Sequence, residues 1–365
     1  MKVVSALQED IMSTSGIHSR LIILLSATMA LGMLACTPEG TTTEPSAGPS
    51  QTRRANATYT AVDLGPPGFP SIANAINPAG QIVGVSQSAQ TFQSHATLWD
   101  NGVLKDLGTL GGPHSSATAI NPAGQVVGFS SLAGPGGDEL QHAFLWDNGV
   151  VTDLGTLAGN FSTATGINPR GQVVGASSTS GVNLHAFLWE HGVMTDLGTL
   201  GGTFSAAAGI NPAGRVVGSS TTAVEGETHA FLWANGVMTD LGTLGGTISS
   251  AAAINPKGQV VGTSRTAEGH PHAFLWENGV MTDLGTLGGC CSDAIAINPA
   301  GQIVGSIVTA ALERRAALWT DGVITDLGTL GGDFSQVGGI NPAGEIVGAS
   351  VTGTGQFHAT LWTRK

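Results

Sequence analysis

Residues 162–204 read STATGINPRGQVVGASSTSGVNLHAFLWEHGVMTDLGTLGGTF, and close variants of this stretch fill most of the chain. The tripeptide Ile-Asn-Pro occurs seven times, at intervals of 43 to 47 residues. The seven Trp residues all fall in one column of the repeat, and Asp-Leu-Gly also recurs seven times. A fixed period in this range indicates a repeat architecture in which each copy is one supersecondary unit.

Each copy contains four short apolar segments separated by turn residues. In the quoted copy we predict strands over 162–167, 172–176, 185–189 and 193–197. The first turn, Asn168-Pro-Arg-Gly171, places Pro and Gly where a tight turn requires them. The third turn keeps a Gly, as in Asn148-Gly149, which favours a two-residue hairpin. The connection between the second and third strands varies most, and the longest copy has its extra residues there, over 132–141.

Four antiparallel strands per copy, repeated seven times, predict a seven-bladed β-propeller of four-stranded antiparallel blades over residues 59–365. The two ends of this region complement each other. The first copy begins with a fourth strand, over 59–65, and the last copy stops after a third strand, over 358–362. Pairing the N-terminal strand with the C-terminal strands would complete a blade and leave no unpaired edge. An open β-solenoid and two separate smaller sheets are the alternatives.

Side-chain size indicates where each strand lies in the blade. The first strand is rich in small residues, as in Ala-Ala-Ala-Gly over 206–209, which suits the crowded axis of a ring. The third strand ends in the repeated Trp, which is large enough to fill the wider gap between blades. We therefore expect the first strand to be innermost and the Trp to pack between adjacent blades.

Composition limits the class of protein. Lys and Arg number 13 against 25 Asp and Glu, a net charge of −12, which argues against a nucleic-acid partner. A hydrophobic fraction of 41% argues against a disordered chain. The sequence contains no phosphate loop, zinc-protease motif, calcium loop or nucleophile elbow. We therefore assign no catalytic residue, no metal site and no cofactor.

The first 36 residues resemble an export signal. Residues 21–35 form an apolar run that is short for a membrane-spanning helix. Met33-Leu-Ala-Cys36 resembles a bacterial lipobox, so we predict lipidation at Cys36, with plain secretory cleavage as the alternative. Residues 37–58, rich in Thr, Pro, Ser and Gly, predict a flexible stalk. These features predict an outer-membrane or cell-surface lipoprotein held to the membrane by its lipid only, or else a secreted protein.

Two motifs recur in order over residues 59–365: His185-Ala-Phe-Leu-Trp189 and Asp196-Leu-Gly-Thr-Leu-Gly-Gly202 are one example of each. Together they resemble the HAF family of extracellular bacterial repeats. The resemblance implies secretion or a surface location, and it implies no activity and no catalytic residues. Two copies read His-Ala-Thr-Leu-Trp, starting at His95 and His358, and one copy lacks the His because it reads Arg315-Ala-Ala-Leu-Trp319. The His is therefore not required in every blade.

The repeated His and Asp columns contain residue types that can bind metal ions or act as acid–base groups. Equivalent residues on different blades are spread around a ring, so they cannot converge on one ion or one bond. We therefore expect these His and Asp side chains to hydrogen-bond inside each blade.

The connections between strands two and three should share a face with the links between blades. Binding is usually carried by loops on a rigid scaffold, so this variable-loop face is the candidate site. A column just before the Ser of the first strand would form an apolar collar there, able to stack on a sugar ring or hold an apolar peptide side chain. The alternative is that these residues pack between blades as core. The candidate ligand-binding residues are Phe69, His114, Phe161, Phe204, Ile248 and Phe334, with Cys291 in the same column.

Two other departures from the repeat fall in the same region. Irregular acidic residues would attract cations or a basic partner, or simply keep the rim solvated. They are Asp138, Glu139, Glu225, Glu227, Glu268, Asp293, Glu313 and Asp333, with Arg265, Arg314 and Arg315 among them. Cys290 and Cys291 are neighbours, and outside the cytoplasm two such thiols can oxidise to a vicinal disulfide or remain as free, partly buried thiols.

Together these features predict a tethered, monomeric, non-enzymatic binding or scaffold propeller that recognises protein or glycan through its variable-loop face. A purely structural role in the envelope is compatible with the same features. The alternative is a propeller-type polysaccharide hydrolase or lyase. That activity would require the irregular acids, His114 or His270 to meet near the axis, with carboxylates about 5–10 Å apart.

Overall fold

The structure is a computed structural model that describes residues 59–65, 69–87, 92–133, 140–181 and 183–365. The chain divides into two units, residues 1–50 and 51–365, and every described residue belongs to the second. The predicted signal peptide, Cys36 and the stalk therefore lie outside the described residues. The second unit is all-β, with 28 strands among its described residues.

The strands form four-stranded antiparallel sheets that follow the sequence repeats. Repeats one to three contain β2 (Ser71–Ile76), β3 (Ile82–Gln87), β4 (Ser94–Asp100) and β5 (Val103–Asp106); β6 (Gly111–Ile120), β7 (Val126–Leu132), β8 (Leu140–Asp147) and β9 (Val150–Asp153); and β10 (Ser162–Ile167), β11 (Val173–Ser178), β12 (Leu184–Glu190) and β13 (Val193–Asp196). Repeats four to six contain β14 (Gly201–Ile210), β15 (Val216–Thr222), β16 (Thr228–Ala234) and β17 (Val237–Asp240); β18 (Gly245–Ile254), β19 (Val260–Thr266), β20 (Pro271–Glu277) and β21 (Val280–Asp283); and β22 (Gly288–Ile297), β23 (Ile303–Thr309), β24 (Arg314–Thr320) and β25 (Val323–Asp326). Repeat seven contains β26 (Gly331–Ile340), β27 (Ile346–Thr352), β28 (Phe357–Arg364) and β1 (Tyr59–Asp63). Repeats four and five are joined into one eight-stranded sheet by a single parallel pair, Thr228 with Ile248.

The strands predicted for the third repeat agree with β10 to β13 to within two residues at each end. The turns also follow their predicted chemistry. In the hairpins between strands three and four, the first turn residue has a φ between 49° and 52° and the next is a Gly with positive φ, as a two-residue primed turn requires. The first residues of these hairpins are Asn101, Asn148, His191, Asn235, Asn278 and Asp321.

A β-bulge in the first strand explains the Gly of the second strand. In repeat three the register shifts between Ala164 and Gly166, and this bulge brings the Thr163 carbonyl against Gly175. A Cβ on Gly175 would overlap that oxygen, so only Gly fits the position. The same overlap would occur at the matching residue of each repeat, namely Gly84, Gly128, Gly175, Gly218, Gly262, Gly305 and Gly348.

The Asn of each Ile-Asn-Pro turn is buried and bonds to the next repeat. Asn168 Oδ1 accepts hydrogen bonds from the backbone N–H groups of Arg170 and Gln172, and Asn168 Nδ2 donates to the Asn211 carbonyl. The equivalent Nδ2 donation occurs in every repeat, at 3.2–3.4 Å, and the last bond runs from Asn341 back to Asn77. We call this set of bonds the asparagine ring; its members are Asn77, Asn121, Asn168, Asn211, Asn255, Asn298 and Asn341.

A second set of bonds joins repeats through the Ser of the first strand. Ser205 Oγ accepts from the Ala186 N–H of the preceding repeat and donates to the Gly198 carbonyl of the link. A Ser Oγ accepts the matching Ala N–H at each junction, and these Ser are Ser71, Ser115, Ser162, Ser205, Ser249, Ser292 and Ser335. Since all seven are buried, each junction has a satisfied polar contact inside an apolar core.

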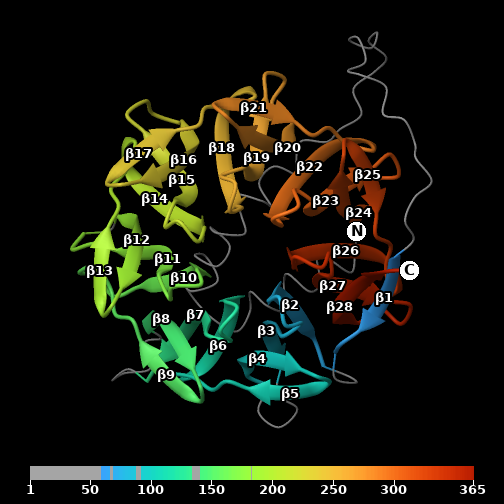
Figure 1. Ribbon diagram of the computed structural model, residues 1–365, viewed down its shortest axis with the longest axis horizontal. Helices are drawn as coiled ribbons and strands as arrows, with labels where there is room; N and C mark the ends of the chain where they lie inside the picture. The colour runs from blue at the N-terminus through green and yellow to red at the C-terminus, as the bar shows by residue number, and fades with distance from the viewer. Residues whose placement is uncertain (1–58, 66–68, 88–91, 134–139, 182) are drawn as a thin grey trace. The chain divides into compact units, whose positions relative to one another are not determined.

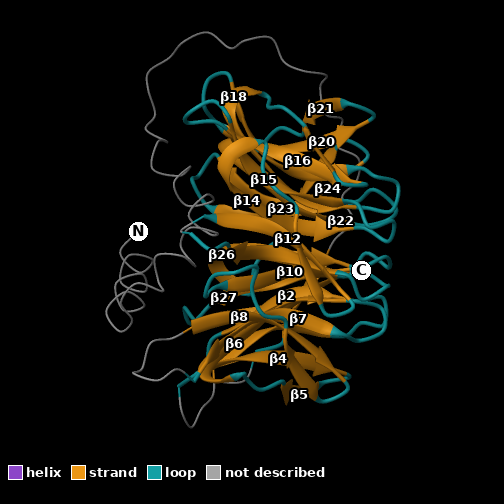
Figure 2. Ribbon diagram, turned by 90° about the vertical axis from the view of Figure 1, so that its left-hand side faces the viewer, coloured by secondary structure: helices purple, strands orange, loops and turns teal. Residues whose placement is uncertain are grey.

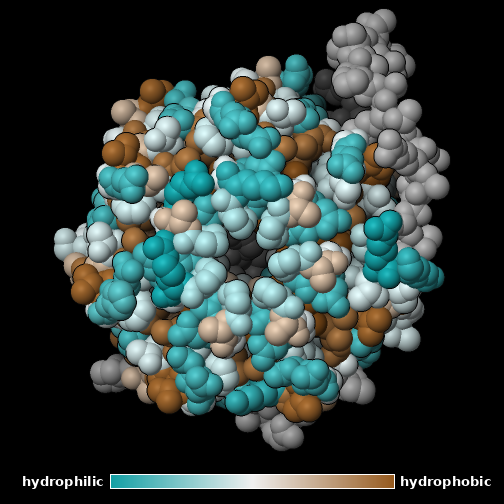
Figure 3. Space-filling view, in the orientation of Figure 1, coloured by the Kyte–Doolittle hydropathy of each residue, from teal (hydrophilic) through white to brown (hydrophobic). Residues whose placement is uncertain are grey.

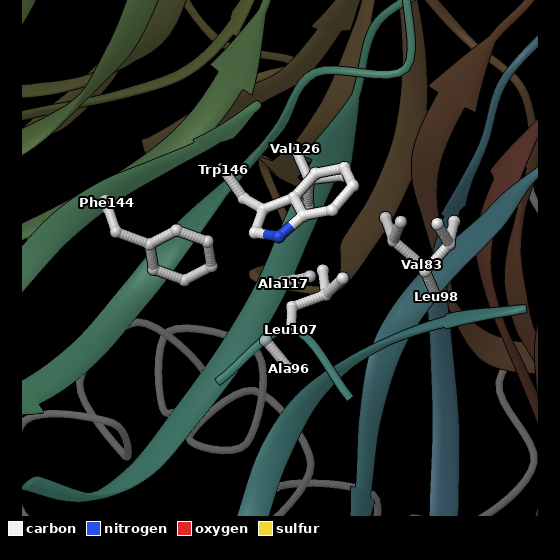
Figure 4. Close-up of a cluster of buried hydrophobic side chains, with 8 residues drawn as sticks. All are labelled: Val83, Ala96, Leu98, Leu107, Ala117, Val126, Phe144 and Trp146. Carbon is white, nitrogen blue, oxygen red and sulfur yellow. The ribbon is translucent and has the colours of Figure 1, made fainter. Parts of the chain in front are cut away.

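The hydrophobic core lies between adjacent sheets rather than in one centre. In Figure 4, Trp146 and Phe144 of repeat two lie in one cluster with Val83, Leu98 and Leu107. Trp99, Trp319 and Trp362 occur in similar clusters that join their repeats to the preceding ones. The prediction that the repeated Trp packs between adjacent repeats is therefore confirmed at these junctions.

The sheets are set side by side around a common centre, with the first strands innermost (Figure 1). Each first strand contacts the first strand of the next repeat, and β26 contacts β2. The first described strand, β1, pairs with the last, β28, from Tyr59 with Arg364 to Asp63 with Thr360.

The connections lie at the two ends of the strands, as the side view shows (Figure 2). The Ile-Asn-Pro turns and the Asn-Gly hairpins share one end, which we call the turn face. The connections between strands two and three share the other end, the variable-loop face, with the links between repeats. Seen in the orientation of Figure 1, the surface has a central hollow with mostly hydrophilic surroundings, and its apolar side chains form separate spots (Figure 3).

Candidate functional site

The repeated His and Asp side chains bond to each other inside each sheet, as predicted. His Nδ1 on the third strand lies 2.7–2.9 Å from an Asp carboxylate oxygen on the fourth. The pairs are His95–Asp106, His142–Asp153, His185–Asp196, His229–Asp240, His272–Asp283 and His358–Asp63. The same Asp accepts the N–H of the Gly two residues later, so each pair fixes the start of a link.

In repeat five, the environment of the His272–Asp283 pair lowers the pKa of the Asp283 carboxyl group. Burial of Asp283 favours its neutral form, but hydrogen bonds from His272 and the Gly285 N–H, together with the His272 charge, outweigh it. The net result is a pKa for Asp283 below its usual value. This ionised carboxylate is a structural acceptor rather than a proton donor.

Three of the predicted collar residues contact the preceding repeat. Phe161 pairs with Gln141 and Ile248 pairs with Thr228, and the backbone N–H of Ser94 donates to His114 Nδ1 at 3.3 Å. Each of these partners lies at or beside the start of the third strand in the preceding repeat. The ring of Phe334 lies 5.6 Å from that of Phe357, which belongs to the same repeat.

The collar column keeps accessible surface at most positions. Phe69, Phe161, Phe204, Ile248 and Phe334 are half-buried and His114 is exposed, whereas Cys291 is only 5% exposed. Part of the packing between repeats therefore comes from this column. Ligand binding by its half-buried members stays a prediction.

Repeat six departs from the others near its variable-loop end. Asp293, on the first strand, keeps 14% of its side chain exposed, and its Oδ1 lies 3.5 Å from Arg314 Nη2. Arg315 replaces the repeated His and bonds to Glu313 at 2.8 Å. Asp293 Oδ2 and Arg314 Nε are buried and have no hydrogen-bond partner among the described residues. This end of the sheet is therefore polar and only partly paired.

Burial raises the pKa values of two groups in this cluster, Asp293 and Cys291. Desolvation raises the pKa of Asp293, and the nearby Arg314 charge only partly opposes it. Desolvation, with the Asp293 charge, also raises the pKa of the Cys291 thiol. The Sγ atoms of Cys290 and Cys291 lie 2.7 Å apart. A disulfide between these neighbours stays a prediction, and mass spectrometry after alkylation without reductant would measure it.

The irregular acids are placed on several repeats. Glu225, Glu227, Glu268 and Glu313 lie in or beside connections between strands two and three, and Asp333 lies at the start of a first strand. Asp138 and Glu139 lie outside the described residues. The nearby Thr266 side chain is the main cause of the lowered pKa of Glu268. The described residues contain no cluster of three or more potential metal ligands and no helix long and apolar enough to span a membrane.

The turn face holds a feature that the sequence reasoning missed. A cleft of about 430 Å³ lies between repeats one and two, and its lining includes Gln81, Asp100, Lys105 and Trp146. One residue in the sequence marks this cleft, namely Lys105, because the same repeat position is Thr in the next five repeats.

The described strands and their arrangement define the fold as a β-propeller, and comparison with solved structures supports this class. The chain is similar to the β-propeller domain of the Trilobed protease from Pyrococcus furiosus, with 10% identity and a TM-score of 0.54 over 81% of this chain and 94% of that one. It is also similar to an acylaminoacyl peptidase from Pyrococcus horikoshii, with 11% identity and a TM-score of 0.52 over 80% and 51% of the two chains. A puromycin-hydrolyzing peptidase from Mycobacterium tuberculosis gives 12% identity and a TM-score of 0.51 over 77% and 49%.

These likenesses concern the fold alone, because the identities are low and this chain spans about half the length of the two peptidases. No protein-family model and no curated protein matches the chain.

Proposed function

We propose that the chain is an exported, non-enzymatic binding or scaffold protein, built as a closed seven-bladed β-propeller of the HAF-repeat family. Pairing of β1 with β28 and the return of the asparagine ring from Asn341 to Asn77 support closure. In this proposal the variable-loop face recognises a protein or a glycan, and residues 59–365 form the propeller.

The observation that carries the binding role is Leu312, at the tip of a connection on the variable-loop face. Its N–H donates to the Thr309 carbonyl, and in repeats five and seven the same turn position is held by Gly269 and Gly355. Leu312 has a φ of 61° and is 67% exposed, so it strains the backbone and gains little burial. Phe92, with a φ of 56° and 68% exposure, is similar. An apolar side chain that is held at positive φ without gaining burial supports a contact with a partner at these positions.

The remaining parts of the proposal concern location and assembly. The protein would be carried to the outer membrane or cell surface by residues 1–36, lipidated at Cys36, and held on the stalk of residues 37–58, as a monomer without a cofactor. Metabolic labelling with radioactive palmitate tests the anchor, because Cys36→Ser should abolish incorporation. Label that persists in this variant would contradict lipidation at Cys36.

Binding is tested with the purified 37–365 fragment on a glycan array and in pull-downs from envelope extracts. A captured protein or glycan should bind more weakly to Leu312→Gly, which restores the residue used in repeats five and seven. Val237→Thr, an exposed change on the turn face, is the matched control and should bind normally. Equal binding by all three proteins would refute the role of Leu312, and cleavage of a polysaccharide by the fragment would favour the enzyme alternative.

A further inference from the structure

The cleft on the turn face has the size and lining of a small-molecule site. Its volume of about 430 Å³ is within the usual range for such sites. Strands β4 and β5 of repeat one form one wall, and the β6–β7 turn and Trp146 of repeat two form the other. Apolar residues such as Leu98 and Pro122 alternate with polar side chains along these walls.

A carboxylate is held in a fixed position on the repeat-one wall. Asp100 Oδ2 accepts from Gln81 Nε2 at 3.0 Å, and Asp100 Oδ1 accepts from Asn101 Nδ2 at 2.9 Å. Gln81 is itself held by Asn77 Nδ2, a member of the asparagine ring, at 2.8 Å. Each carboxylate oxygen can accept a further hydrogen bond, so Asp100 is an oriented acceptor for a donor in the cleft.

A cation lies on the same wall without neutralising this carboxylate. Lys105 Nζ is 4.6 Å from the centre of the Trp146 ring. In the register of β4 with β5, Asp100 pairs with Val103 and Leu98 pairs with Lys105, so Asp100 and Lys105 are diagonal neighbours, whose Cα atoms lie roughly 7–8 Å apart in such a pair. Within the described part of the chain, neither residue forms an ion pair. The cleft thus offers a separated cation and acceptor beside apolar surface.

The repeat shows that Lys105 is not required by the fold. The same strand position is Thr in repeats two to six, at Thr152, Thr195, Thr239, Thr282 and Thr325. The junction between repeats two and three contains the same oriented carboxylate. There, Gln125 Nε2 donates to Asp147 Oδ2 at 3.0 Å and Asn148 Nδ2 donates to Asp147 Oδ1 at 2.8 Å. That junction has Thr152 in place of Lys105, and Arg170 in place of Ala123 on the other wall, so a Lys introduced at position 152 tests whether this strand position supplies the binding charge.

We propose that this cleft binds a hexuronic acid unit, that is, a sugar ring that carries a carboxylate. The sugar carboxylate bonds to Lys105, ring hydroxyls donate to Asp100, and an apolar face of the ring packs against the exposed side chains of Val103 and Pro122. An α-amino acid fits less well, because its two charged groups share one carbon whereas Lys105 and Asp100 are set apart along the wall. This site lies on the face opposite the variable loops, so it stands independently of the partner proposed for that face.

Isothermal titration of the purified protein with methyl β-glucuronide, methyl β-glucoside and glycine tests the ligand class. The glucuronide should bind at one site per chain, and the glucoside, which has a neutral hydroxymethyl group in place of the carboxylate, should bind at least about tenfold more weakly. Absence of glucuronide binding, equal affinity for the two sugars, or tighter binding of glycine would overturn the proposal.

Substitutions of single residues test whether the glucuronide binds in the cleft. Lys105→Thr should weaken glucuronide binding about tenfold and leave the unfolding temperature unchanged, whereas Lys257→Thr, which removes a turn-face charge outside the cleft, should bind as the parent does. Thr152→Lys should create a second site at the next junction and raise the stoichiometry from one to two. Equal losses in Lys105→Thr and Lys257→Thr would show a general charge effect and refute the site, as would a Thr152→Lys variant that gains no binding.

Discussion

The Asn of each Ile-Asn-Pro turn has three tasks that no other side chain combines. Its Oδ1 organises its own turn, as Asn168 does by accepting from the Gln172 N–H, and its Nδ2 donates both to the Gln172 side chain and to the next repeat. An Asp would lose the donor, and a Gln would place the amide one carbon further away. The repeated Asn is therefore explained by packing between repeats, not by chemistry on a ligand.

Removing one of these amides should be costly. Asn168→Ala leaves buried backbone groups without partners, so we expect the free energy of unfolding to fall by about 2–4 kcal/mol. Arg170→Ala, an exposed change in the same turn, should alter it by less than about 0.5 kcal/mol. Urea unfolding followed by Trp fluorescence measures both, and equal effects would contradict a role for the asparagine ring.

The His272–Asp283 pair should make stability depend on pH in the acid range. Because the pKa of Asp283 is lowered in the folded state, its ionised form contributes stability at a pH above 3.8, the usual value, and this contribution is lost as the pH falls through the lower folded pKa. Asp283→Asn should therefore destabilise the protein well above that pH and make less difference well below it. Urea midpoints of both proteins across this range are the measurement; a pH-independent difference would contradict it.

At the scale of the strand, the first and second strands of each repeat constrain each other. The bulge in the first strand turns a backbone carbonyl toward the second strand, and the second strand has a Gly at the point of contact, as Thr163 and Gly175 show. The Val-Val-Gly and Ile-Val-Gly patterns therefore encode two buried residues and one close backbone contact. A pattern of alternating polarity alone would not have shown this contact.

A single methyl group should disrupt this pairing. Gly175→Ala brings its Cβ onto the Thr163 carbonyl, so we expect a loss of about 3 kcal/mol or more. Gly181→Ala is the matched control, because open space surrounds its Cβ position, and it should be near neutral. Thermal unfolding of both variants measures the difference. A Gly175→Ala protein as stable as the control would refute the constraint.

At the scale of the whole molecule, stability depends on junctions between repeats rather than on one central core. Each junction combines a Trp or Phe cluster, a buried Ser and one bond of the asparagine ring. The sheet of repeat seven is unusual because its fourth strand, β1, precedes all the other strands in the sequence. Its Asp63 supplies the carboxylate for His358, so the pair common to most repeats is completed across the two ends.

Removing β1 should therefore lower the stability of the whole all-β unit, not only that of its own sheet. A chain that starts at residue 64 exposes the edge of β28, and we expect its unfolding temperature to fall by about 5 °C or more relative to a chain that starts at residue 59. Size-exclusion chromatography should also show association through the open edge. Identical melting and elution of the two chains would contradict closure by β1.

The sequence by itself determined the repeat, its four strands and its turn types, because these depend on local periodicity and on φ preferences of Asn, Pro and Gly. It also indicated the His–Asp pairs and the Trp packing, since each column recurs in order. Only the tertiary structure decided which columns meet across a junction: the asparagine ring, the buried Ser bonds and the position of Lys105 over Trp146 join residues of adjacent repeats. Such contacts depend on how neighbouring sheets pack in space, which no local pattern records.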